Sequence, residues 1–131
     1  MTAAFKKAQA VTYIADWDHK GTVTFRHAIV YSCGKKQMVL TDAATGEEMG
    51  RHFAPELGSL TGTFPRMTDD EARAACLKAA EAILEDQRAR YAACLARGHG
   101  DAYNASIRKD LAKLHEPRAI SHAEAVAAVS R

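Results

Sequence analysis

Paired cysteines, long apolar runs and a strong excess of one charge are all missing from this sequence of 131 residues. The three cysteines, Cys33, Cys76 and Cys94, form no CxxC motif, and the six histidines lack metal-ligand spacing. A structural zinc site requires such spacing, so no metal site is predicted. An odd number of cysteines without a secretion signal indicates free thiols, which are typical of a cytoplasmic protein.

The lack of apolar runs and of net charge narrows the class of protein further. Residues 1–18 contain two lysines but return to polar residues before any long apolar stretch, which predicts neither a signal peptide nor a membrane span. The formal net charge is only +2, too little to indicate a nucleic-acid or membrane partner by itself. With 47% hydrophobic residues, the chain is predicted to form one domain, 1–131, with a real core.

Residues 1–66 have the pattern of a β-sheet, because β-branched and aromatic residues alternate with polar ones between short Asp, Gly and Lys turns. Four consecutive strands with short turns predict an antiparallel meander. The segment 54–66, rich in glycine, proline and hydroxyl residues, is predicted to be a crossover loop. The predicted strands are 11–17, 22–33, 37–41 and 48–53.

Alternation also predicts which faces of the first two strands pack on the core. On the first strand the predicted core face contains Val11, Tyr13, Ala15 and Trp17. On the second strand it contains Val23, Phe25, His27, Ile29, Tyr31 and Cys33.

Residues 67–131 are rich in alanine, leucine, glutamate and arginine, which favour helices. Thr68 and Glu71 form a capping box, and Gly98 is a stop signal, so a helix of about thirty residues, roughly 45 Å long, is predicted between them. A second helix is predicted before Pro117, from apolar residues at helical spacing. A short third helix is predicted from a capping box of Ser121 and Glu124.

The long helix carries one apolar stripe, which is predicted to cover the sheet, and an opposite face rich in alanine. The stripe consists of Leu77, Ala80, Leu84, Gln87, Tyr91 and Cys94, and the opposite face contains Ala74, Lys78, Ala82, Glu85 and Ala93. A dimer seam is the alternative use of the stripe, but it spans fewer than three heptads and includes Gln87. Because small side chains permit close helix approach, Ala82 and Ala93 are the candidate self-association residues of a homodimer. The predicted fold class is α+β: a four-stranded antiparallel meander packed on one long helix, followed by two shorter helices.

Two short motifs suggest bound ligands but do not pass a spacing test. The run "DWDHKG" resembles part of a calcium-binding EF-hand loop, yet Lys20 occupies a ligand position and His27 stands where the bidentate glutamate belongs. The run "SCGKKQ" lacks the first glycine of a phosphate-binding P-loop, since Ile29 stands there, and Lys36 replaces the required Ser or Thr. No cofactor is predicted.

Cys33 is the one candidate nucleophile for an enzyme. A thiol site would need His27 or His52 as the base and Asp42 as the group that orients it. Cys33 and His27 are six residues apart on one strand, roughly 20 Å, so only His52 remains a plausible base. A buried structural thiol is the alternative, and catalytic residues are therefore predicted to be absent.

Six basic residues cluster around the Gly98 turn and are the candidate partner-binding residues: Arg88, Arg90, Arg97, Arg108, Lys109 and Lys113. Pooled at one end of the molecule, they would suit an acidic protein surface or phosphates. The alternative is that they are ordinary solvated helix residues, with Asp86 paired to Arg90 and Asp110 among the second group.

These patterns lead to a ranked set of functional hypotheses. The first is a small non-enzymatic interaction module, a regulator or inhibitor that binds a partner protein. Small phage and plasmid inhibitors such as anti-CRISPR and anti-restriction proteins have this general character, by analogy of type only. The alanine- and arginine-rich composition agrees with a bacterial or phage origin.

The second hypothesis is direct nucleic-acid binding by the basic group, with base stacking on Tyr13, Trp17, Phe25 and Tyr31. The third is a thiol enzyme that uses Cys33.

Overall fold

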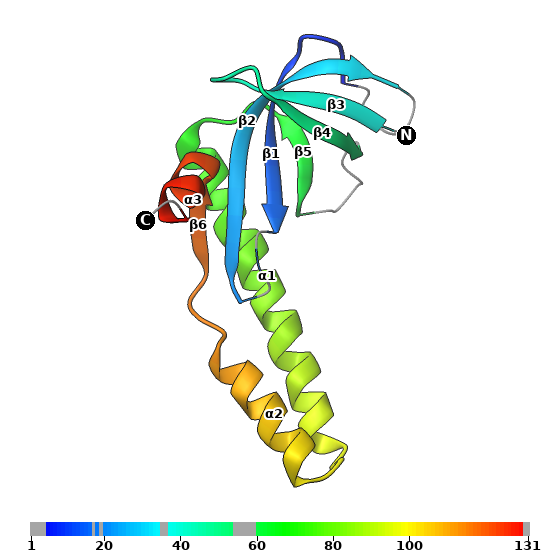
Figure 1. Ribbon diagram of the computed structural model, residues 1–131, viewed down its shortest axis with the longest axis vertical. Coiled ribbons are helices and arrows are strands. Elements are labelled where there is room, and N and C mark those ends of the chain that lie inside the picture. The colour runs from blue at the N-terminus through cyan, green and yellow to red at the C-terminus, as the bar shows by residue number, and fades with distance from the viewer. Residues whose placement is uncertain (1–4, 17, 19, 35–36, 54–59, 130–131) are drawn as a thin grey trace.

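The computed structural model describes residues 5–16, 18, 20–34, 37–53 and 60–129 of the chain. It is an α+β fold in which one sheet packs on a long helix, with two shorter helices after it (Figure 1). The elements in chain order are β1 (Ala10–Asp16), β2 (Thr22–Cys33), β3 (Gln37–Asp42), β4 (Glu48–Phe53), β5 (Gly62–Pro65), α1 (Asp69–Ala96), α2 (Asp101–Ala112), β6 (Arg118–Ser121) and α3 (His122–Val129).

The first four strands form the predicted antiparallel meander, but the sheet has six strands in the order β4-β3-β2-β1-β5, with β6 paired to β2. The prediction that 54–66 is only a crossover loop is wrong, because Gly62–Pro65 pairs antiparallel with β1. β6 was also missed, and it lies parallel to β2. Both strands have four residues, too few to show an alternating pattern, and Pro65 is tolerated because β5 is an outer strand of this order.

β2 organises the sheet because it pairs with three strands. β1 occupies one of its edges, while the other edge is divided between β6, along Thr22–Phe25, and β3, along Ala28–Cys33. β4 and β5, at the two ends of the strand order, contact each other. The sheet is therefore strongly curled, and both of its faces are covered in places.

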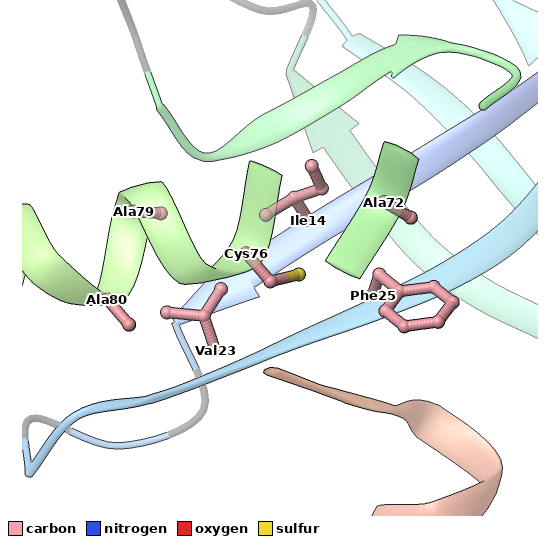
Figure 2. Packing of buried hydrophobic residues seen from close by; sticks show 7 residues of the cluster. All are labelled: Ile14, Val23, Phe25, Ala72, Cys76, Ala79 and Ala80. Carbon is pink, nitrogen blue, oxygen red and sulfur yellow. The ribbon is translucent and has the colours of Figure 1, made fainter. Parts of the chain in front are cut away.

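One face of the sheet packs against α1. Ile14 of β1 and Val23 and Phe25 of β2 face the first turns of the helix (Figure 2). Their partners on α1 are small, which allows the helix to approach the strands closely; they are Ala72, Cys76, Ala79 and Ala80. This explains why a helix with little apolar contrast between its faces still has five buried residues.

A second apolar cluster fills the other face of the curled sheet. It consists of Phe5, Val11, Ala28, Val30, Met38 and Leu40. The predicted single core face of β2 is therefore wrong beyond Phe25. Val30 is 1% exposed, whereas Tyr31 is 63% exposed and Cys33 is exposed at the strand end. The cause is the curl of the sheet, which brings opposite faces of the two halves of β2 into different cores. Trp17 lies outside the described residues.

Both helix-capping predictions are confirmed. The Thr68 hydroxyl accepts a hydrogen bond from the Glu71 amide, and the Glu71 carboxylate accepts one from the Thr68 amide, so α1 starts at the predicted box. Ser121 and Glu124 make the same reciprocal pair at the start of α3. Gly98, at φ +65°, follows the end of α1 as predicted.

The predicted apolar stripe of α1 is partly wrong. Leu84 is 1% exposed, but Leu77 is 39% exposed, and the helix instead turns Cys76 and Ala79 toward the strands. The small side chains set this rotation, because they let the helix axis come close to the sheet. Toward its C-terminal end α1 extends past the sheet and pairs with α2 (Figure 1). The end of the predicted stripe therefore meets a helix where strands were expected, as the contact of Cys94 with Tyr103 of α2 shows. No helix in the described residues is long and apolar enough to cross a membrane.

Candidate functional site

Two surfaces carry the chemically active side chains: an open groove on the sheet and the projecting pair of helices α1 and α2. The groove has a volume of about 750 Å³ and lies where β3 and β6 diverge from β2. Its walls are the turn after β3, the residues at the start of α1, and α3. Phe25, Arg26 and His27 of β2 lie between these walls.

His27 connects three elements at the groove. Its Nε2 atom lies 2.6 Å from a carboxylate oxygen of Asp69, the first residue of α1. Its Nδ1 atom lies 3.0 Å from the hydroxyl of Thr12, which also accepts a hydrogen bond from the Met67 amide. Because both ring nitrogens are engaged, His27 holds the start of α1 on the sheet and is not placed to act as a base for Cys33.

Arg26 and Asp42 form a second, partly buried pair in the groove. Arg26 Nε lies 2.6 Å from Asp42 Oδ2, and the other Asp42 oxygen accepts hydrogen bonds from the amides of Ala44 and Thr45. Partial burial alone would raise the pKa of Asp42, but the hydrogen bonds from Arg26, Thr45 and Ala44 outweigh it and lower the pKa to about 2. Asp42 therefore fixes the turn between β3 and β4, and it does not orient a histidine.

The proposed thiol constellation is not assembled in the described residues. Cys33 is exposed, and its thiol donates to the carbonyl of Gly34 at 3.6 Å. Its backbone pairs with Met38, which pairs with His52, so Cys33 and His52 belong to one row across the sheet. The side chain of His52 lies outside the described part of the chain. Burial raises the pKa of the Cys76 thiol to about 11, against the opposing effect of Arg73, so Cys76 is protonated at neutral pH.

The helices α1 and α2 bring the six basic candidates onto one projection of the molecule. All six side chains are exposed: Arg88, Arg90, Arg97, Arg108, Lys109 and Lys113. Two of them are in ion pairs within their own helices, Arg90 with Asp86 at 2.8 Å and Lys113 with Asp110 at 3.7 Å. The other four form no ion pair with any residue that the structure describes.

The two helices are joined by polar and aromatic contacts near their turn. A side-chain hydrogen bond links Cys94 of α1 to Tyr103 of α2, and it raises the pKa of Tyr103. The ring of His99 meets the Tyr103 ring edge-on, with centroids 5.1 Å apart. We call residues 87–113 the α1–α2 hairpin. The self-association candidates Ala82 and Ala93 are both exposed on α1, and no other part of the described chain covers them.

Sequence reasoning missed the groove. It considered Asp42 as part of a thiol site and His27 as a core-face residue, a tested EF-hand position and a candidate base, and it did not associate Arg66, Asp69 or His122 with either of them. The partners His27 and Asp69 are 42 residues apart, and no spacing rule connects a strand residue to the first turn of a later helix. The turn chemistry of "DAATGE" was the only local signal, and it correctly marked the turn that Asp42 caps.

Within the described residues, no group of three or more His, Cys, Asp and Glu side chains is arranged to hold a metal ion. Comparison of the chain with protein-family models, with curated proteins and with solved structures finds no match.

Proposed function

We propose that the protein is a small cytoplasmic, non-enzymatic interaction module, a regulator or inhibitor, that binds an acidic surface of a partner protein through the α1–α2 hairpin. The observation that carries this proposal is the distribution of charge. Residues 87–113 contain six Arg and Lys against two Asp, whereas the rest of the chain contains twelve basic and fourteen acidic residues. A weakly basic chain thus has one basic end.

The geometry of the hairpin supports a single binding surface. Arg88 and Lys109 are ten and eleven residues from Gly98 along the chain, so each lies roughly 15 Å from the turn, on α1 and α2 respectively. Their helices are in contact, which places the two groups of basic residues at the same level. Exposed charges arranged this way attract an acidic partner and orient it during encounter.

The structure weakens one support for the nucleic-acid alternative. Of the four aromatics considered for base stacking, Phe25 is 2% exposed and Tyr13 is half-buried, and Trp17 lies outside the described residues. Tyr31 is exposed, but it belongs to the end of β2 that is far from the hairpin (Figure 1). Direct nucleic-acid binding by the hairpin remains the second candidate, and the following experiment separates the two.

The test compares the wild type with Arg97→Glu combined with Lys109→Glu. Both proteins are used to capture partners from nuclease-treated extract of the native host, and both are titrated with random duplex and single-stranded oligonucleotides. A protein partner should bind the wild type with weak salt dependence, because only rim charges are screened. The double variant should bind the same partner with a slower association rate.

Lys6→Glu combined with Lys7→Glu is the matched control, because it changes the same amount of charge at exposed positions away from the hairpin. It should bind the partner as the wild type does. Oligonucleotide affinity that falls by roughly 10³ between 50 and 200 mM salt, and that only the hairpin variant loses, would replace this proposal with the nucleic-acid alternative.

A further inference from the structure

We propose that the groove between the β3–β4 turn and α3 is a binding site for a small organic carboxylate with an apolar body, whose charged group is held by Arg66. This site is separate from the α1–α2 hairpin and does not depend on the function proposed for it.

The size and the lining of the groove suit a small molecule. Its volume of about 750 Å³ falls within the range of roughly 300–1,000 Å³ that is typical of small-molecule sites. Small apolar side chains form its walls: Ala43 and Ala44 from the turn, and Ala123, Val126 and Ala127 from α3. Val126 is 50% exposed, so apolar surface is available to a ligand without any rearrangement.

The charged groups in the groove that already have partners determine whether a positive or a negative ligand fits. Each carboxylate there already has a cationic or hydrogen-bonding partner: Asp42 and Glu47 lie 2.6 and 3.8 Å from Arg26, and Asp69 binds His27. Arg66 also lines the groove, but it forms no ion pair or hydrogen bond with another described residue. An entering ammonium group would compete with Arg26 and His27, whereas an entering carboxylate meets an available guanidinium.

One neighbouring group completes the polar part of the site. The Ser121 hydroxyl is already engaged, because it accepts a bond from the Glu124 amide and is hydrogen-bonded to the Glu124 carboxylate. The His122 ring lines the groove and has no hydrogen bond to the rest of the described chain. A guanidinium binds a carboxylate through two parallel hydrogen bonds, so Arg66 is the main determinant of specificity and the His122 ring is secondary.

The test uses 4-phenylbutanoate and 4-phenylbutan-1-amine, which share an apolar body and differ in the sign of their charge. Each is titrated into isotope-labelled protein, and the amide signals of Ala43, Ala44, Ala123 and Ala127 are followed by NMR. We expect saturable shifts with the carboxylate and at least about tenfold weaker binding of the amine. Arg66→Gln should weaken carboxylate binding about tenfold or more, because a charge-assisted bond is lost.

Two further variants make the result decisive. Lys6→Gln removes an exposed positive charge elsewhere and should leave the affinity unchanged. Ala123→Trp, at an exposed position of α3, should fill the groove and block binding although Arg66 is retained. Equal affinity for the two probes, unchanged binding by Arg66→Gln or Ala123→Trp, or no saturable shift at concentrations on the order of 10 mM would overturn the proposal.

Discussion

Leu84 lies against Gly21 at the point where β1 turns into β2. The φ of Gly21 is +125°, which favours glycine at this turn, and a Cβ atom added to it would stand in tight contact with Leu84, 3.0 Å from Cδ1. Leu84 is 1% exposed and is the last fully buried residue of α1. The Leu84 side chain thus fixes the position of α1 along the β1–β2 turn.

Replacement of Leu84 by alanine should therefore cost about 2–5 kcal/mol of unfolding free energy, through lost burial and the cavity left beside Gly21. Urea denaturation of the purified variant measures this. Ala82→Glu and Ala93→Glu are controls on the exposed side of α1 and should change stability by less than about 0.5 kcal/mol. A change of oligomeric state in Leu84→Ala, with a folded monomer, would show that the stripe is a dimer seam.

Asp42 makes a prediction about acid stability. Its pKa in the folded protein is about 2, below the ordinary value near 3.8, so the unfolded chain binds more protons between these two values. Stability from this group is complete above about pH 4 and is lost as the pH falls toward 2. This difference in pKa between the folded and the unfolded state corresponds to about 2 kcal/mol of unfolding free energy. Asp42→Asn should lower stability at pH 7 by that order and flatten the decline below pH 4.

The control for Asp42 is Asp86→Asn, which breaks the exposed pair with Arg90 and should cost less than about 0.5 kcal/mol. Denaturation at a series of pH values compares the two variants. If the unfolding free energy of Asp42→Asn falls below pH 4 as steeply as that of the wild type, other carboxylates control the loss of stability.

At the level of elements, the start of α1 depends on its capping box. Thr68→Ala removes the acceptor for the Glu71 amide and should cost about 1 kcal/mol. Thr45→Ala is the matched control, because the Thr45 hydroxyl accepts a single bond from Glu47 in an exposed turn. It should cost less than half as much. Equal losses in thermal or urea unfolding would show that the cap does not limit the stability of α1.

Arg73 of α1 holds the last strand and helix in place. It donates to the carbonyl of Ala119 in β6 at 3.2 Å, pairs with Glu124 of α3, and stacks over Phe25. Arg73→Met keeps an apolar stem but removes these bonds. Hydrogen exchange should then become faster for amides of β6 and α3 while β1 and β3 are unaffected. Arg88→Met, an exposed change on the same helix, should not alter hydrogen exchange in β6. If Arg88→Met accelerates exchange in β6 as much as Arg73→Met does, Arg73 has no special role.

The elements that sequence predicted correctly are those with strong local signals. The four long strands have alternation and turns, and α1 and α3 have capping boxes, so their boundaries agree within a few residues. β5 and β6 have neither, since each is made by pairing to a strand that is distant in the chain. The same reason hid the groove: His27, Asp69 and His122 come together only when β2, α1 and α3 are assembled.

At the scale of the whole molecule, burial is uneven. Apart from Phe5, both core clusters belong to the sheet and the first turns of α1, whereas α2 contains no buried residue. The α1–α2 hairpin should therefore open at a lower free energy than the sheet. Hydrogen exchange followed by mass spectrometry should show faster exchange in 101–112 than in 22–33. Equal protection of the two segments would show that the hairpin is stabilised by a contact between copies of the chain. Exchange in the hairpin should then become faster when the protein is diluted.

The division of one β2 edge between β3 and β6 has a consequence for how the chain reaches its native state. β3 follows β2 after a short turn, but Arg118 meets Thr22 only after a loop of 96 residues has closed. During synthesis β6 emerges after every other strand, so the edge at Thr22–Phe25 waits unpaired until then. Such an edge can pair with another nascent chain. We therefore expect the late arrival of β6 to be the step at which folding competes with aggregation, and we expect folding to be slower than that of a simple meander.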